Sequence, residues 1–119
     1  MKKILIAEDE KAISDALKLK LSHVGYEVSQ AQDGEQALSV LQNGNIDLII
    51  LDLMMPKIDG FAVLEEIKKK NIKTPVIVAT NLSQEEDEKR VLALGAKDYI
   101  VKSDTTLDEI IKRVQKIIG

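Results

Sequence analysis

The chain of 119 residues has 45% apolar residues, 31% charged residues and a formal net charge of -3, which fits one compact domain with its own hydrophobic core. Positive and negative side chains are interleaved, so the chain has no basic tract for nucleic acid, and its slight acidity disfavours anionic membranes. The absence of cysteine excludes disulfides, thiolate metal sites and thiol nucleophiles, and it fits a reducing cytoplasm.

Short apolar runs rich in branched residues predict the strands. The first run, 4–7, ends after four residues, which is far short of the about 18 needed to span a membrane, and we interpret it as a buried strand rather than a signal peptide. A more polar segment, 27–31, follows Gly25 and is predicted to be an edge strand. The remaining runs are apolar throughout, which is typical of strands buried on both faces of a parallel sheet. They cover 48–51, 76–79 and 99–101.

Apolar residues at helical spacing separate these strands and predict five helices. We expect the helices over 11–23, 34–42, 60–70, 84–94 and 106–118. Five units of strand followed by helix, joined by short connections, predict an α/β doubly wound sheet. We expect one domain over residues 1–119.

Polar side chains follow four of the predicted strands at their carboxyl ends. Glu8 and Asp9 follow the first strand, Asp52 the third, Thr80 the fourth and Lys102 the fifth. Because open parallel sheets bind ligands beyond the carboxyl ends of their strands, we expect three acids, a hydroxyl and an ammonium to meet at one edge. Each of these residues alone would be common in a loop after a strand. Their joint placement at one edge is what indicates a functional site.

This set of groups favours phosphoryl chemistry. Three close carboxylates repel one another unless a cation neutralises them. A set of oxygen ligands with few carboxylates suits Mg2+, with Mn2+ or weakly bound Ca2+ as substitutes. Lys102 can pair with one phosphoryl oxygen, and the Thr80 hydroxyl can donate to another. Asp52 then remains as the nucleophile for an in-line attack on phosphorus.

The order and spacing of these residues resemble the receiver domain of two-component response regulators, in particular the single-domain chemotaxis regulator. The resemblance covers almost all of the chain and rests on Glu8-Asp9, the stretch 52–60, Thr80 and the stretch 95–102. It implies a flavodoxin-like sheet of five parallel strands in the order 2-1-3-4-5 with five helices. It also implies a phosphorylation-dependent signalling switch. Such a switch is not an enzyme: the only reactions it catalyses are its own phosphorylation and its own slow dephosphorylation.

The resemblance assigns the reacting groups one by one. It implies that Asp52 accepts the phosphoryl group from a sensor histidine kinase or a histidine phosphotransfer protein. It makes Asp9 a direct Mg2+ ligand together with the Asp52 carboxylate and the backbone carbonyl of Met54, and Glu8 the holder of the metal's waters. Lys102 would contact the phosphoryl group.

The resemblance also implies a switch. Thr80 would move toward the phosphoryl group and Tyr99 would change rotamer in step, while the backbone amide of Asn81 contacts a phosphoryl oxygen. This movement would alter the face formed by the fourth helix, the fifth strand and the fifth helix, which a downstream partner reads. The sequence identifies neither the kinase nor that target.

Four residues depart from the family pattern. Ser103 stands where a cis proline is usual, and since a non-proline cis bond costs about 2.5–4 kcal/mol, we expect a trans peptide and slower phosphorylation. Asn81 replaces a smaller alanine and is expected to narrow access for small phosphodonors. Met54 and Leu82 are apolar and cannot hold an attacking water by hydrogen bonds, so we predict a long-lived phosphoryl-aspartate.

Three other functions compete with this interpretation. A receiver that signals through binding without phosphorylation is the main alternative, supported by Ser103 and Asn81. A phosphohydrolase with an aspartyl nucleophile is disfavoured, because Met54 stands where such enzymes need a second aspartate and no cap domain fits. A flavin-binding domain is disfavoured by the lack of a glycine- or hydroxyl-rich loop after the first strand.

The remaining conspicuous residues have structural interpretations. We expect His23 on the surface, the Met54-Met55 pair in loop packing, and Gly60 in a tight turn before the third helix. The acidic run 85–88 is interpreted as a solvated face of the fourth helix, which has few apolar anchors and is predicted to be the most mobile element.

The residues are compatible with more than one assembly and with more than one length of the whole protein. Asp98 and Arg113 occupy positions resembling charges that the family uses in dimers, but isolated surface pairs are weak support. We expect a monomer or a weak dimer linked to phosphorylation. The chain is either a stand-alone regulator or a piece of a longer one.

Overall fold

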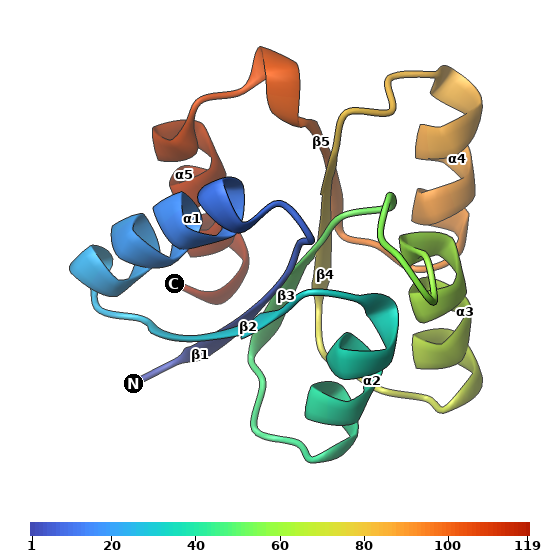
Figure 1. The fold of residues 1–119 in the computed structure, drawn as a ribbon, viewed down its shortest axis with the longest axis horizontal. Coiled ribbons are helices and arrows are strands. Elements are labelled where there is room, and N and C mark those ends of the chain that lie inside the picture. The colour runs from blue at the N-terminus through green and yellow to red at the C-terminus, as the bar shows by residue number, and fades with distance from the viewer.

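A computed structural model describes all 119 residues and confirms the predicted α/β fold (Figure 1). The five strands form one parallel sheet in the order β2-β1-β3-β4-β5, which is the order that the resemblance implies. The elements are β1 (Lys3–Ala7), α1 (Lys11–Val24), β2 (Glu27–Ala31), α2 (Gly34–Gln42), β3 (Leu48–Leu51), α3 (Gly60–Lys69), β4 (Val76–Thr80), α4 (Glu85–Ala93), β5 (Asp98–Val101), the 3-10 turn η1 (Lys102–Asp104) and α5 (Leu107–Ile118).

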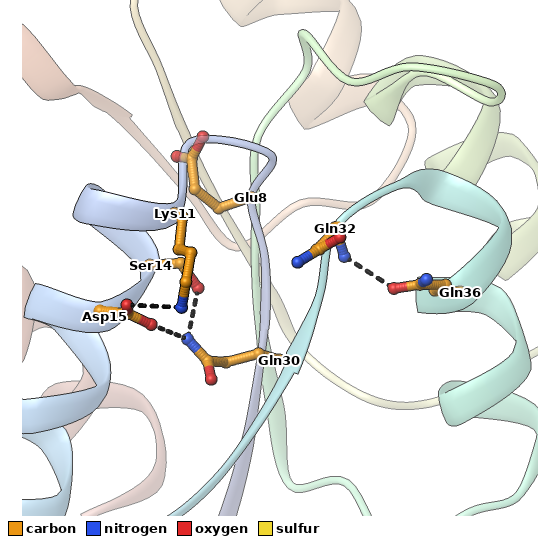
Figure 2. A pocket seen from close by; sticks show the side chains of 7 residues that line it. All are labelled: Glu8, Lys11, Ser14, Asp15, Gln30, Gln32 and Gln36. Carbon is orange, nitrogen blue, oxygen red and sulfur yellow. Dashed lines mark hydrogen bonds and ion pairs between the residues drawn. The ribbon is translucent and has the colours of Figure 1, made fainter.

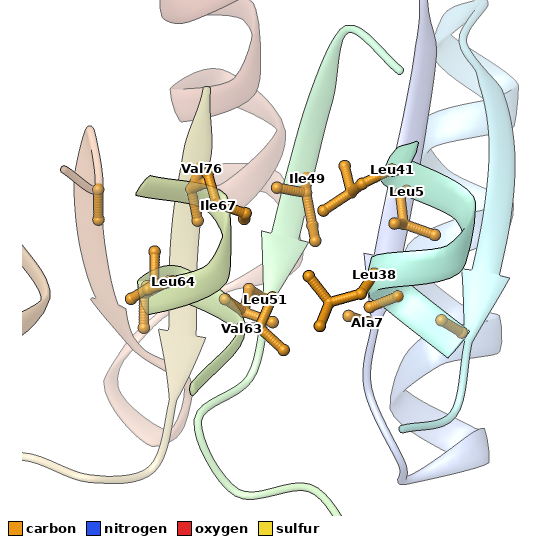
Figure 3. Close-up of a cluster of buried hydrophobic side chains, with 14 of the residues drawn as sticks. Leu5, Ala7, Leu38, Leu41, Ile49, Leu51, Val63, Leu64, Ile67 and Val76 are labelled. Atoms are coloured by element: carbon orange, nitrogen blue, oxygen red, sulfur yellow. The ribbon is translucent and has the colours of Figure 1, made fainter. Parts of the chain in front are cut away.

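The helices cover the sheet in two layers. In Figure 1, α1 and α5 lie on one side of the sheet, whereas α2, α3 and α4 lie on the other. Successive residues of a strand point to opposite faces. Leu5 and Ala7 of β1 therefore belong to the core under α2 and α3, and Ile4 and Ile6 to the core under α1 and α5. Figure 3 shows the first of these cores.

Burial along the strands follows the predictions. Strands β3 and β4 are buried at every position, and β1 at all but its first residue, whereas the edge strand β2 is exposed or half-buried except at Ala31. The continuous apolar runs thus mark the strands covered on both faces. The core on each side holds the strand ends of the sheet in fixed register.

The helix boundaries are set by local signals. Gly25 ends α1 with a φ of 108° and its N–H bonds to Leu21 and Ser22, as the sequence predicts for a glycine in this position. Asp33, Asp59 and Thr106 cap the amino ends of α2, α3 and α5 by accepting backbone hydrogen bonds. Helix α5 therefore begins one residue later than predicted, because Thr106 is its cap.

Helix α4 is anchored weakly, as the sequence suggests. Only Val91 of its nine residues is buried, and most of the acidic run at its start is exposed. Whether this helix is also the most mobile element stays a prediction. His23 is exposed, as expected for a surface residue. No helix of the structure has the length and apolar character that crossing a membrane requires.

Candidate functional site

The polar residues predicted at the strand ends converge at the carboxyl edge of the sheet. Glu8 follows β1 and Asp52 follows β3, Thr80 is the last residue of β4 and Lys102 opens the 3-10 turn after β5. The side chains of Glu8 and Asp52 are joined through Lys102, so residues separated by up to 94 positions meet at one place. The parallel sheet brings them together because all its strands end on the same side.

Three carboxylates gather at this edge. Glu8, Asp9 and Asp52 each offer an oxygen, and these oxygens all lie within 4.8 Å of one another. Glu8 and Asp52 are almost fully buried, whereas Asp9 is exposed. A cluster of hard oxygen donors with one side open to solvent fits a cation that keeps several waters, as Mg2+ does. The residues present thus fit the group that the sequence implies.

Lys102 provides the counter-charge of the site. Its Nζ lies 2.6 Å from Glu8 Oε1 and 3.1 Å from Asp52 Oδ2, and its side chain is only 9% exposed. The chain contains no cis peptide bond, so the bond before Ser103 is trans, as expected for a serine in place of proline. The trans backbone still brings the ammonium to both buried carboxylates.

The electrostatics of the pair depend on burial. Burial is the main cause that raises the pKa of Glu8 from 4.5 to about 7; the hydrogen bond from Lys102 opposes this rise, and the charge of Asp52 adds to it. For Lys102, burial lowers the pKa, but the contacts with Glu8 and Asp52 outweigh burial and hold the pKa above its ordinary value. Lys102 is therefore the fixed cation, and Glu8 is the acid that exchanges its proton near neutral pH.

The backbone around Asp52 fixes its carboxylate. The Met54 N–H donates to Asp52 Oδ1 at 3.2 Å, and the Gly60 N–H donates to the Leu53 carbonyl at 3.0 Å. The sequence predicted a tight turn at Gly60, but Gly60 does not have a positive φ. The reason for glycine is space: a Cβ there would lie 2.4 Å from the Asp52 carbonyl oxygen. Gly60 thus lets α3 begin directly against the backbone of Asp52.

Thr80 and Tyr99 are connected through the backbone of one residue, Leu82. The Leu82 N–H donates to Thr80 Oγ1 at 3.4 Å, and the Tyr99 hydroxyl donates to the Leu82 carbonyl. Thr80 is fully buried and Tyr99 half-buried. Burial raises the pKa of Tyr99, with Asp87 and Glu88 of α4 contributing, so its hydroxyl stays a donor. No side-chain pattern in the sequence indicates this connection, because Leu82 takes part with its backbone only.

Two other predicted residues lie at the rim, because Asn81 is exposed and Met54 is 57% exposed. Met55 is buried in loop packing as expected, but the same prediction was wrong for Met54, whose side chain faces solvent. Asp98 accepts two hydrogen bonds from Arg113, at 2.8 and 3.0 Å. These two charges, considered for a dimer, are thus paired within the chain.

A polar hollow of about 380 Å³ lies beside the site and was not predicted from the sequence (Figure 2). Gln30 of β2 donates to Ser14 Oγ at 2.8 Å and to Asp15 Oδ1 at 2.9 Å on α1, and Glu8 lies at one end of the hollow. All its lining side chains are polar. Their hydrogen bonds join β2 to α1, and they present no nucleophile paired with a base.

Comparisons of the sequence with known proteins all match the same family of domains. A model of the response regulator receiver domain matches residues 4–115. A probable transcriptional regulator, ycf27 of Porphyridium aerugineum, is 42% identical over 96% of this chain and 50% of its own length. The chain spans about half the length of the curated relatives it matches.

Solved structures of the same family resemble this chain over nearly its whole length. The receiver domain of the Francisella response regulator 1452 has a TM-score of 0.93 and 37% identity, covering 98% of this chain and 96% of its own. The response regulator TrrA of Thermotoga maritima, solved in complex with Mg2+ and BeF, has a TM-score of 0.87 and 40% identity, covering 98% and 99%.

Proposed function

This chain belongs to the response regulator receiver family of two-component signalling, and on that premise we propose that it is a phosphorylation-dependent switch whose phosphoacceptor is Asp52. The supporting observation is the arrangement around that residue: a buried carboxylate bonded to Lys102 and grouped with Glu8 and Asp9. Receiver domains act as signalling switches rather than as enzymes with turnover. The proposed donor is the phosphohistidine of a sensor kinase or a histidine phosphotransfer protein.

The acidic cluster is the proposed Mg2+ site. Asp9, Asp52 and the backbone carbonyl of Met54 would hold the ion directly, and Glu8 would hold its waters. Mn2+ is a plausible substitute on the same oxygen ligands. When bound, the ion neutralises the carboxylates and screens the charge of the incoming phosphoryl group.

The chain's own groups then perform the transfer. An Asp52 oxygen attacks phosphorus in line, its new P–O bond forms as the P–N bond to the donor histidine breaks, and the histidine nitrogen leaves with the electron pair and takes a proton. Lys102 pairs with one phosphoryl oxygen, and the Thr80 hydroxyl donates to another. The Asn81 N–H is the proposed donor to a third. Positioning and charge neutralisation supply most of the catalysis.

The transfer is proposed to reach the surface through Thr80, Leu82 and Tyr99. A shift of the Thr80 hydroxyl toward the phosphoryl group removes the acceptor of the Leu82 N–H. The Leu82 carbonyl belongs to the same residue and accepts from Tyr99, so the loop before α4 and the tyrosine respond together. The phosphoryl charge biases a two-state equilibrium of the α4, β5 and α5 face.

The relatives indicate a general class of downstream output. Several are described as transcriptional regulators about twice as long as this chain, so a DNA-binding output in a longer protein is the proposal for the whole molecule. This domain itself is proposed to bind a protein partner and no nucleic acid. Because Arg113 and Asp98 are paired internally, a monomer is favoured over a weak homodimer.

A receiver that acts without phosphorylation is the second candidate. It is favoured by the contacts of Lys102, whose ammonium lies closer to Glu8, at 2.6 Å, than to Asp52, at 3.1 Å. Titration with beryllofluoride in Mg2+ separates the two. The switch predicts saturable shifts of the amide resonances of residues 52–60 and 80–82, and their loss in Asp52→Ala. No change at saturating reagent would favour the second candidate.

A further inference from the structure

Gly34, the first residue of α2, is in direct contact with the loop that follows Asp52. A Cβ at this position would lie 2.0 Å from the carbonyl oxygen of Ile58 and 2.9 Å from its Cβ, and real Cβ atoms essentially never approach closer than 3.0 Å. Gly34 does not have a positive φ, so alanine would suit its backbone. The position requires glycine because the space is filled by Ile58.

A second contact holds the same part of the loop to the start of α2. Lys57 Nζ lies 3.8 Å from Asp33 Oδ2. Asp33 is buried and caps α2 by accepting from the Gln36 N–H at 2.8 Å. Lys57 has a φ of 66°, a conformation that L side chains rarely adopt. The middle of the loop is thus held against α2 at two neighbouring points.

The other end of this loop carries the proposed metal site. Met54, four residues before Ile58, donates its N–H to Asp52 Oδ1, and its carbonyl is a proposed Mg2+ ligand. Met55, which lies between Met54 and Ile58, is buried, and Ile58 itself packs against the core under α2 and α3. The loop therefore has little freedom to absorb a displacement at Ile58 before it reaches Met54.

We infer that Gly34 is a positioning residue for the phosphorylation site, acting through the loop from Leu53 to Asp59. Opening the contact with Ile58 from 2.0 Å to at least 3.0 Å would move the loop that orients both Met54 and Asp52. Mg2+ tolerates little deviation from octahedral geometry. This inference rests on the proposed function, because it concerns the same metal and the same carboxylate.

The test compares Gly34→Ala with Gly44→Ala. Gly44 has a φ of 80° and open space around its Cβ position, so alanine there destabilises the domain without touching the loop. Mg2+ is titrated into each protein and followed by the amide resonances of residues 52–60, and stability is measured by urea unfolding without metal. We expect Gly34→Ala to weaken Mg2+ binding by about 10- to 100-fold and Gly44→Ala to leave it unchanged.

A milder variant, Ile58→Ala, covers the case in which Gly34→Ala does not fold. Ile58 is half-buried, so its truncation loosens the loop on α2 without a clash, and Mg2+ binding should weaken in the same direction. If the unchanged domain binds Mg2+ and the folded variants bind it with the same affinity, the positioning role of Gly34 is overturned while the proposed function stands. No saturable Mg2+ binding by the unchanged domain overturns the proposed function, and this inference with it.

Discussion

Lys102 donates a hydrogen bond from Nζ to Glu8 Oε1 at 2.6 Å, which is shorter than its contact with Asp52 at 3.1 Å. The ammonium is therefore held mainly by the acid that does not receive the phosphoryl group. For Lys102 to pair with a phosphoryl oxygen, part of its bond to Glu8 has to be given up. Glu8 thus affects both the stability of the resting domain and the availability of Lys102.

Glu8→Gln should remove a pH dependence of stability. The folded pKa of Glu8 is raised from 4.5 to about 7, so ionised Glu8 is disfavoured in the folded state. Without divalent ions, the stability of the unchanged domain relative to Glu8→Gln should be highest below pH 4.5 and fall until about pH 7, by on the order of 1–3 kcal/mol. Urea unfolding across this range measures it, with Glu65→Gln, at an exposed position, as control. Parallel curves would contradict the prediction.

Lys102→Met should destabilise the domain at pH 7.5 in the absence of metal. The change leaves the buried carboxylates of Glu8 and Asp52 without their cation, and we expect a loss of about 1–3 kcal/mol. The loss should shrink at pH 5, where Glu8 takes up a proton. Lys116→Met, at an exposed residue without an ion pair, controls for a lost surface charge. A gain of stability at pH 7.5 would refute this account of the site.

Tyr99→Phe should uncouple the face formed by α4, β5 and α5 from the phosphorylation site at Asp52. It removes the hydroxyl that bonds the Leu82 carbonyl and should cost about 1 kcal/mol of stability. Saturating beryllofluoride should still shift the resonances of residues 52–60, whereas shifts in α4 should diminish. Tyr26→Phe is the matched control, because the Tyr26 hydroxyl makes no side-chain hydrogen bond although its ring is buried. Undiminished shifts in α4 would exclude Tyr99 from the coupling.

Met54→Asn should shorten the lifetime of the phosphorylated domain. Met54 is 57% exposed at the rim of the site and offers no side-chain hydrogen bond to an attacking water, whereas asparagine does. We expect slow loss of the phosphoryl group from the unchanged domain and faster loss from the variant, followed by intact mass over time. Leu92→Asn, exposed and on α4, is the control. A half-life of seconds for the unchanged domain would contradict the prediction.

Much of the fold could be predicted because burial leaves a direct pattern in the sequence. The continuous runs at 48–51 and 76–79 correspond to strands buried on both faces, and the polar run at 27–31 to the edge strand β2. The meeting of Glu8, Asp9 and Asp52 followed from the rule that parallel strands end on one side of a sheet.

Contacts that involve the backbone could not be predicted in this way. Leu82 connects Thr80 with Tyr99 through its N–H and carbonyl, which every leucine has, so its side chain gives no signal. Gly60 was assigned to a turn, but glycine is needed there because α3 begins against the Asp52 backbone. The shorter contact of Lys102 with Glu8 than with Asp52 depends on side-chain geometry that the spacing of these residues does not specify.

The central claim is that Asp52 accepts a phosphoryl group, and its most direct test is labelling of the purified domain by a phosphohistidine donor in Mg2+. The unchanged domain should gain one phosphoryl group that is lost in acid and on treatment with hydroxylamine. Asp52→Asn, which keeps the size of the side chain, should gain none while remaining folded. Labelling of Asp52→Asn with the same sensitivity to hydroxylamine would contradict the account.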